Sequence, residues 1–369
     1  MTIVLNGTTG ITTPTTSTTG EFVTSVTGFK NRIINGGMVI DQRNAGASVT
    51  PSADTYLLDR WGYSASQTSK FTFQQNKGSV TLPDGFANYL GASVASAVTV
   101  GASDYFALYT KVEGFNAADL GWGAAGASAV TLSFKVYSSL TGTFGGTVCN
   151  SANTRCYPFT YSIPVANTWT TISITIAGDT TGTWLKTNGT GINIQFGLGV
   201  GSTYSGTAGS WSGTQYISAT GATSVVGTLN ATFYITGVQL EKGSTATNFD
   251  YRPYGTELQL CQRYYYQLKP AGTNPIAVGY CRATTRMDTY VFFPVTMRSA
   301  PTGSVVSGTN FYYVDYSQAS TNMNSFTIDQ TYFQGARLVN TGLSGLTAGS
   351  GAALYTNDAT ASASFNAEL

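Results

Sequence analysis

Hydrophobic residues alternate with polar residues over short stretches through most of the chain. The clearest run is 192–200, which places Ile192, Ile194, Phe196, Leu198 and Val200 on one face and Asn193, Gln195, Gly197 and Gly199 on the other. Residues 130–137 and 172–176 repeat this period of two, which is typical of strands with one buried face. Many such strands, separated by turn residues and without helical patterns between them, predict a large antiparallel jelly-roll β-sandwich over residues 28–254.

One helical pattern follows this region. Leu258, Cys261 and Tyr265 recur at the spacing of one helix face, which predicts a short linking helix over residues 255–268. Pro270 and Gly272 then open a second β-rich region, predicted as a smaller β-sandwich over residues 269–369. The predicted class is therefore all-β, with two sandwiches joined by a helix.

The first 27 residues form a threonine-rich leader whose only charged residue is Glu21. Such a segment buries too little apolar surface to fold alone, so we expect other chains to order it. Its start lacks the basic and continuous apolar stretches of a signal peptide. No window of the chain has the apolar length of a transmembrane helix. We therefore expect a soluble product of a cytosol, without membrane insertion.

Charge composition excludes several kinds of chemistry. The 369 residues include 18 Lys and Arg, 17 Asp and Glu and no histidine, and 9% are charged, against about 25% in ordinary globular proteins. Catalytic relays and zinc motifs that need histidine are absent from such a sequence. The balanced charge also lacks the basic excess that nucleic-acid binding requires, so we predict no nucleic-acid partner.

The four cysteines and the acidic residues suggest no cofactor. Cys149, Cys156, Cys261 and Cys281 match no zinc-site spacing, which favours packed free thiols; a Cys149–Cys156 disulfide is the best alternative pairing. Acidic turns such as the one at Asp179 leave a structural calcium ion open.

Catalysis is not expected from the carboxylates. Glycoside hydrolysis needs two of them about 5–10 Å apart, and the acids here are scattered among turns without a recognisable pairing. We assign no catalytic residue and predict a protein that is not an enzyme.

Aromatic residues in turn-rich segments are candidates for sugar binding, because a sugar stacks on an exposed ring while amides and carboxylates bind its hydroxyl groups. The candidates in the first region are Trp122, Asp179, Trp184, Asn188, Tyr204, Trp211 and Gln215, and Tyr312 is added from the second region. Alternatively, each tryptophan anchors its own loop to the domain. Contacts between subunits explain the tyrosines of the second region as well as ligand binding does.

Several segments resemble bacteriophage tail fibres and minor virion structural proteins. The resemblance lies in residues 235–265, from Ile235-Thr-Gly-Val-Gln-Leu-Glu to Gln262-Arg-Tyr-Tyr, in 31–43 with Asp59-Arg-Trp61, in 4–14, in 293–301 and in 367–369. It implies a virion component with a carbohydrate-binding-like jelly-roll module, homotrimeric assembly and residues 1–27 docked on another virion protein. The expected function is a tail or capsid-attached fibre that recognises a host surface polysaccharide. The alternative is a structural adaptor, nozzle or capsid decoration without receptor binding.

Overall fold

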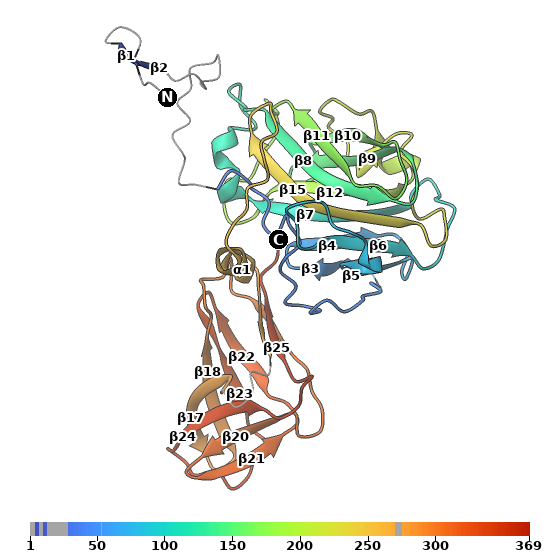
Figure 1. Ribbon diagram of the computed structural model, residues 1–369. Coiled ribbons are helices and arrows are strands. Elements are labelled where there is room, and N and C mark those ends of the chain that lie inside the picture. The colour runs from blue at the N-terminus through green and yellow to red at the C-terminus, as the bar shows by residue number, and fades with distance from the viewer. Residues whose placement is uncertain (1–3, 7–9, 13–28, 53, 270–274) are drawn as a thin grey trace.

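The chain forms two β-units that meet beside one short helix (Figure 1). A computed structural model describes residues 4–6, 10–12, 29–52, 54–269 and 275–369. The predicted all-β class is confirmed, since strands dominate both units and the described residues contain a single α-helix. None of the helices in these ranges combines the length and the apolar character that crossing a bilayer requires.

The first unit is a sandwich of two antiparallel sheets. In spatial order, the six-stranded sheet comprises β10 (Cys156–Ile163), β9 (Gly142–Cys149), β12 (Thr190–Val200), β7 (Tyr105–Glu113), β4 (Trp61–Ala65) and β3 (Thr55–Leu58). The five-stranded sheet comprises β11 (Thr170–Ile176), β8 (Val130–Ser138), β15 (Thr232–Lys242), β6 (Leu90–Val94) and β5 (Phe71–Gln75).

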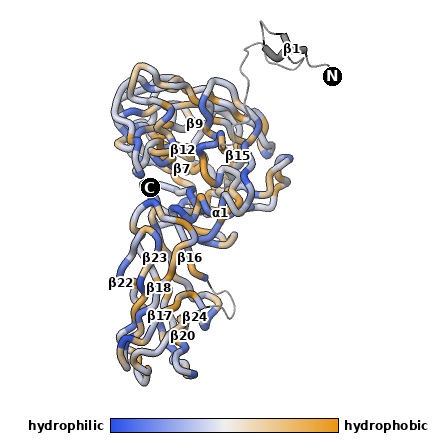
Figure 2. Tube along the Cα trace, turned by 90° about the vertical axis from the view of Figure 1, so that its left-hand side faces the viewer, coloured by the Kyte–Doolittle hydropathy of each residue, from blue (hydrophilic) through white to orange (hydrophobic). Residues whose placement is uncertain are grey.

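Alternation along the strands explains the core of this sandwich. The alternating hydrophobic residues of β12 and β7 face the second sheet. Phe196 contacts Phe134 of that sheet at a ring-centroid distance of 5.1 Å and Trp61 of its own sheet at 6.2 Å. In Figure 2, hydrophobic positions lie inside both β-units. The other face of the six-stranded sheet carries the polar and tyrosine residues of the same strands. The core does not use these side chains, so they are available to a ligand.

Short elements cover part of that outer face. The small parallel pair β13 (Ser205–Gly206) and β14 (Ser218–Ala219) brackets a loop whose Ser212 exchanges two backbone hydrogen bonds with Cys156 on β10.

The 3-10 helices of the described chain are η1 (Lys77–Ser79), η2 (Gly114–Asn116), η3 (Ala118–Leu120) and η4 (Ser202–Tyr204). Cys149 and Cys156 lie opposite each other on β9 and β10 and form the disulfide that the sequence left open. Cys261 and Cys281 are buried free thiols.

The second unit contains a seven-stranded and a three-stranded antiparallel sheet. The larger comprises β21 (Ala319–Met323), β20 (Tyr312–Tyr316), β24 (Gly351–Thr356), β17 (Ala277–Ala283), β18 (Arg286–Phe292), β23 (Gly335–Asn340) and β22 (Thr327–Tyr332). The smaller comprises β16 (Tyr265–Leu268), β25 (Ala363–Asn366) and β19 (Thr302–Val305). Its separate core includes Met287, Tyr312, Leu338 and Phe365.

The linking helix is shorter than predicted. Helix α1 spans Tyr254–Gln262, whereas the sequence suggested 255–268. Residues 265–268 instead form β16, which pairs with β25 from Tyr265 opposite Asn366 to Leu268 opposite Ala363. Consecutive tyrosines favour a strand, and pairing with β25 satisfies their backbone groups, so tertiary contact overrides the helical pattern.

Little of the leader can be described. Strands β1 (Val4–Asn6) and β2 (Gly10–Thr12) pair as an antiparallel hairpin. The predicted attachment and oligomerisation role of residues 1–27 otherwise lies outside the described residues.

Candidate functional site

A polar hollow of about 230 Å³ lies on the outer face of the six-stranded sheet. Its floor comes from β7 and β12, where Gln195 pairs with Tyr109 and Asn193 pairs with Lys111 in the register of the two strands. These residues alternate with core residues, so the pleat turns them away from the sandwich interior. The remaining walls are Asp54, Ser64, Tyr105, Asn153, Tyr204, Gln215 and Ile217.

Four tyrosines shape this hollow and one edge of it. Tyr109 contacts Tyr56 edge to face at 5.7 Å between ring centroids, and Tyr105 contacts Tyr204 in the same way at 5.5 Å. All four side chains are half-buried. Burial, with the nearby carboxylate of Asp54, raises the pKa of Tyr109 to about 12. Its phenol therefore stays neutral and keeps its hydrogen-bonding proton.

Glycine at position 62 makes room for the Tyr109 ring. Gly62 lies opposite Tyr109 on the neighbouring strand β4, and a Cβ built on it would lie 2.3 Å from Tyr109 Cζ. Any side chain there would push the ring out of its place above the sheet.

Three amide side chains in the hollow lack protein partners. Gln195 is 8% exposed, and within the described residues its side-chain amide makes no hydrogen bond. The side-chain oxygens of Asn153 and Asn193 are also buried without a partner there. Buried polar groups in native proteins are normally hydrogen-bonded. A cluster of three unpartnered amides beside tyrosine rings is thus suited to a ligand that carries hydroxyl groups.

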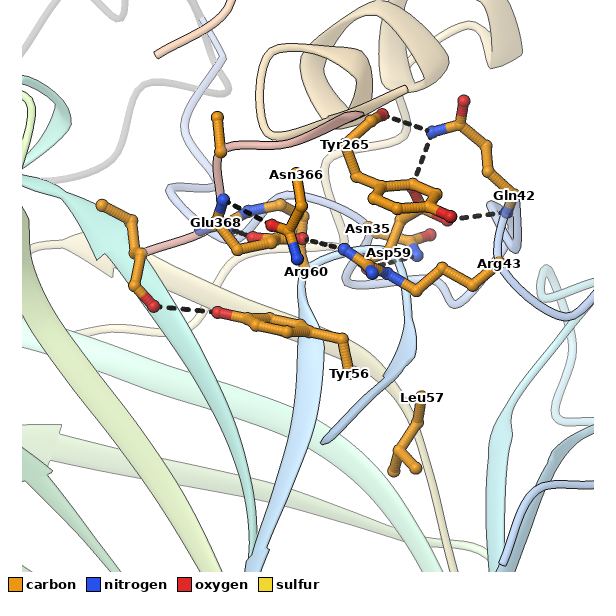
Figure 3. Close-up of polar contacts among 12 residues, drawn as sticks. Asn35, Gln42, Arg43, Tyr56, Leu57, Asp59, Arg60, Tyr265, Asn366 and Glu368 are labelled. Carbon is orange, nitrogen blue, oxygen red and sulfur yellow. Dashed lines mark hydrogen bonds and ion pairs between the residues drawn. The ribbon is translucent and has the colours of Figure 1, made fainter. Parts of the chain in front are cut away.

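The charged groups of the hollow are one carboxylate and one ammonium group. Lys111 Nζ donates a 2.6 Å hydrogen bond to the carbonyl oxygen of Leu369, and Tyr56 Oη donates to the same oxygen at 2.9 Å. Burial and the positive charge of Arg60 lower the pKa of Lys111. Figure 3 shows Tyr56 turned toward the C-terminal segment, which lies against the sandwich here.

Among the lining residues Asp54 is the only acid, so the hollow lacks the carboxylate pair of glycoside hydrolysis.

Two larger hollows of the described chain fit a hydroxyl-rich ligand less well. The hollow of about 690 Å³ beside β20 and β21 is lined by small and polar residues, and its one aromatic residue, Tyr316, is buried. The hollow of about 390 Å³ beside β8 and β11 contains Phe86, Phe249 and Tyr251. These three rings pack edge-on or tilted against one another at 4.9–5.6 Å.

Two of the residues proposed from the sequence do line the hollow. Tyr204 and Gln215 come from the loop around β13 and β14, and the backbone N–H of Ile217 holds this loop together by donating to the Tyr204 carbonyl at 2.8 Å. The structure therefore brings these two candidates together.

The tryptophan candidates are placed elsewhere, which corrects the prediction of exposed stacking rings. Trp122 and Trp184 are buried, and with the half-buried Trp211 they form a cluster whose ring centroids are 4.6–5.4 Å apart. Their indole N–H groups donate to protein oxygens, at 2.7 Å for Trp122 to Ser128 and 2.8 Å for Trp211 to Ala177. The rings anchor their loops because three large apolar surfaces bury one another.

Asp179 belongs to the same anchor. Both of its carboxylate oxygens accept hydrogen bonds from Arg155, at 2.7 and 2.8 Å. Burial alone would raise the pKa of Asp179, but the bonds and charge of Arg155 and the Thr181 N–H hold it below its ordinary value. A calcium ion, which the sequence left open here, would have to displace Arg155. Within the described residues no three acidic, cysteine or histidine side chains are placed to hold a metal ion.

The last two candidates also lie away from the hollow. Asn188 is exposed at the junction of the two units, where its Nδ2 donates to the Arg298 carbonyl at 3.3 Å and its own carbonyl accepts from Arg298 at 2.9 Å. Tyr312 is fully buried, and its hydroxyl donates to the carbonyls of Val306 and Ser362 at 2.6 and 2.9 Å. The even-numbered residues of β20 face the core of the second unit, so Tyr312 offers no surface to a ligand.

Sequence reasoning missed Tyr105, Tyr109, Lys111, Asn153, Asn193 and Gln195 as site residues. The polar face of β12 was visible as an alternation, and β7 carries the same signal in Tyr105, Tyr109 and Lys111. That β7 and β12 are neighbours follows from the sheet order alone, which is not local in sequence.

Comparisons with solved structures gave weak similarities. No protein-family model and no curated protein matches the chain. The chain is similar to the enzymatically active domain of tailspike protein 4 from bacteriophage CBA120, at 12% identity over 58% of this chain and 22% of that chain, with a TM-score of 0.33.

Two carbohydrate-binding modules are similar at the same level. TmCBM61, solved with β-1,4-galactotriose, shows 11% identity over 58% of this chain and 99% of that chain, with a TM-score of 0.30. The family 11 module of a Clostridium thermocellum cellulase shows 11% identity over 56% of this chain and all of that chain (100%), with a TM-score of 0.26. The function of the hollow is therefore inferred from its own geometry.

Proposed function

We propose that the hollow on the six-stranded sheet binds a neutral glycan without cleaving it. The observation that carries this proposal is the set of unpartnered amides of Asn153, Asn193 and Gln195 beside the rings of Tyr105 and Tyr109. Sugar hydroxyls satisfy amide donors and acceptors, and sugar C–H faces pack on aromatic rings. A site built to bond hydroxyls rejects ligands that lack them.

The size and charge of the hollow support a short, neutral portion of a glycan chain. Its volume of about 230 Å³ is below the roughly 300–1,000 Å³ of sites for drug-sized ligands. Asp54 and Lys111 balance each other in formal charge, so nothing in the lining selects an anionic sugar. The single carboxylate supports binding over hydrolysis.

The wider role proposed for the chain is a bacteriophage fibre, on the tail or the capsid, that displays this site to a host surface polysaccharide. It rests on the sequence resemblance, as do homotrimeric assembly, residence in the virion and docking of residues 1–27 on another virion protein.

A purely structural role as adaptor, nozzle or decoration is the second candidate, and one observation favours it. On the outer face of the seven-stranded sheet, Phe292 and Tyr332 flank Gly335 on adjacent strands and are 78% and 53% exposed. Exposed aromatic clusters of this kind are typical of protein interfaces. Contact between copies of the chain through this face is compatible with either role.

Binding of the full-length protein to an array of bacterial polysaccharides and neutral oligosaccharides tests the proposal. We expect binding by the wild type and by Tyr332→Ala, a matched tyrosine substitution outside the hollow. Tyr109→Ala and Gln195→Ala should each reduce affinity about tenfold or more, the effect of losing a stacking ring or a good hydrogen bond. No binding by the wild type, or equal binding by all four proteins, would contradict the proposal and favour the structural role.

A further inference from the structure

The segment that follows β25 leaves the second unit and lies on the sandwich beside the hollow. The N–H of Ala367 donates to the Tyr264 carbonyl at 2.8 Å. Arg298 then donates to the carbonyls of Ala367 and Glu368 at 2.7 and 2.8 Å. Residues 367–369 are thus held by backbone contacts at the junction (Figure 1).

Glu368 enters the sandwich as the counter-ion of buried arginines. Its carboxylate accepts hydrogen bonds from Arg60 and, at 2.9 Å, from Arg43 (Figure 3). The Arg60 side chain is 1% exposed and its guanidinium lies 3.7 Å from the centroid of the Tyr264 ring. Within the described residues Glu368 is the only acid paired with Arg60. The second unit therefore supplies the charge that a core residue of the first unit requires.

From Arg60 the contacts continue into the hollow. Arg60 Nη2 donates to the Lys111 carbonyl at 2.6 Å, and Lys111 Nζ donates back to the Leu369 carbonyl at 2.6 Å. Tyr56 Oη shares that acceptor, and the Tyr56 ring contacts Tyr109. The bond to Leu369 is the only hydrogen bond of the Lys111 ammonium among the described residues. Residues 367–369 thus fix the backbone and the ammonium group of Lys111 and one side of the Tyr109 ring.

We propose that residues 367–369 are a positioning segment of the candidate glycan site. They hold Lys111 and Tyr56 in place, so the shape of the hollow depends on docking of the second β-unit. Glu368 and Leu369 touch no part of the hollow's open space and act through Lys111, Tyr56 and Tyr109. This inference rests on the proposed function for its effect on glycan binding, but its effect on Lys111 is measurable without any glycan.

Reductive methylation of lysines in the full-length protein, read at Lys111 by peptide mass spectrometry, tests the inference. Glu368→Gln should raise the methylation rate of Lys111 about tenfold, the factor expected for losing one hydrogen bond to a charged group. Tyr56→Phe, which keeps the ring and loses one donor to Leu369, should raise it less. Asp358→Asn, an amide substitution in a loop of the second unit, should leave it unchanged. An unchanged rate in both Glu368→Gln and Tyr56→Phe would overturn the inference, and the milder second variant keeps the test decisive if the first fails to fold.

The same variants are then titrated calorimetrically with cellohexaose, maltohexaose, xylohexaose and mannohexaose. We expect weaker binding by Glu368→Gln than by Asp358→Asn. A raised Lys111 reactivity with unchanged affinity would overturn the positioning role. If the wild type binds none of these probes and no glycan on the array, the proposed function fails. The reactivity of Lys111 still decides whether residues 367–369 hold Lys111 in place.

Discussion

The ring of Tyr109 occupies the space above Gly62 on the adjacent strand. A Cβ at residue 62 would lie 2.3 Å from Tyr109 Cζ and 2.5 Å from its hydroxyl oxygen, so the glycine and the tyrosine form one structural unit at the floor of the hollow.

Replacing Gly62 by alanine should displace the Tyr109 ring. We expect affinity for the bound oligosaccharide to fall about as far as in Tyr109→Ala. The free energy of unfolding should fall by about 1–3 kcal/mol, the usual cost of overpacking. Calorimetric titration and urea denaturation measure the two effects.

A matched alanine substitution separates this effect from the general loss of a strand glycine. Gly351 lies on β24, and a Cβ built there would meet nothing within 4 Å. Gly351→Ala should therefore leave affinity and stability nearly unchanged. Retained wild-type affinity in Gly62→Ala would show that the position of Tyr109 does not matter for binding.

The amide of Gln195 should contribute to glycan binding and little to the stability of the fold. Because the amide makes no hydrogen bond within the described residues, methionine of similar size should replace it at little cost to the fold. We expect Gln195→Met to bind oligosaccharide about tenfold more weakly while unfolding at nearly the same urea concentration as the wild type. A variant that is less stable but binds normally would indicate that the amide serves the fold.

The ion pair between Arg60 and Glu368 should contribute far more to the free energy of unfolding than a surface ion pair does. Their side chains are 1% and 4% exposed, so Glu368→Ala leaves a buried charge unpaired and should destabilise the protein by about 3–5 kcal/mol. Asp119, paired with Arg32 and 55% exposed, is the control, and Asp119→Ala should cost less than about 1 kcal/mol. Urea denaturation compares the two, and equal losses would contradict the role of the junction.

The carboxyl of Asp59 should make stability depend on pH. Burial, opposed by the charge of Arg43 and the bonds from Gln42, raises the pKa of Asp59 to about 7. An unfolded chain releases this proton near pH 4, so between about pH 4 and 7 the folded protein holds the extra proton. The free energy of unfolding therefore falls as pH rises through this window, by on the order of 4 kcal/mol from this group.

Asp59→Asn should remove this contribution, because an amide does not titrate. Unfolding free energies are measured in urea at pH 4.5 and pH 7. The value for the variant minus the value for the wild type should be more positive at pH 7, because only the wild type loses stability over this range. The absence of histidine leaves this window free of imidazole titration. A constant difference at both pH values would show that Asp59 is already ionised in the fold.

Local patterns in the sequence identified the strands but not their neighbours. The alternation of Ile194 and Phe196 with Asn193 and Gln195 predicted a half-buried strand, and β12 has that form. The same patterns could not show that β7 lies beside β12, because the register between them joins residues about 90 positions apart, such as Tyr109 and Gln195. The site is a product of sheet order, which local periodicity does not encode.

The tryptophan candidates illustrate a second limit. An aromatic ring in a turn-rich segment has the same sequence signature whether it binds a sugar or anchors its loop. Trp122, Trp184 and Trp211 come from three separate segments and bury one another, which only the tertiary structure reveals. Composition likewise gave no sign that Glu368 would pair with Arg60 across more than 300 residues.

A crystal structure of the full-length protein with the oligosaccharide that binds most tightly on the array would show whether the hollow on the six-stranded sheet holds the sugar. We expect a sugar ring packed against Tyr105 or Tyr109, with its hydroxyls bonded to the amides of Gln195 and Asn193. A sugar bound at another surface, with the hollow on the six-stranded sheet left to solvent, would contradict glycan binding by the hollow.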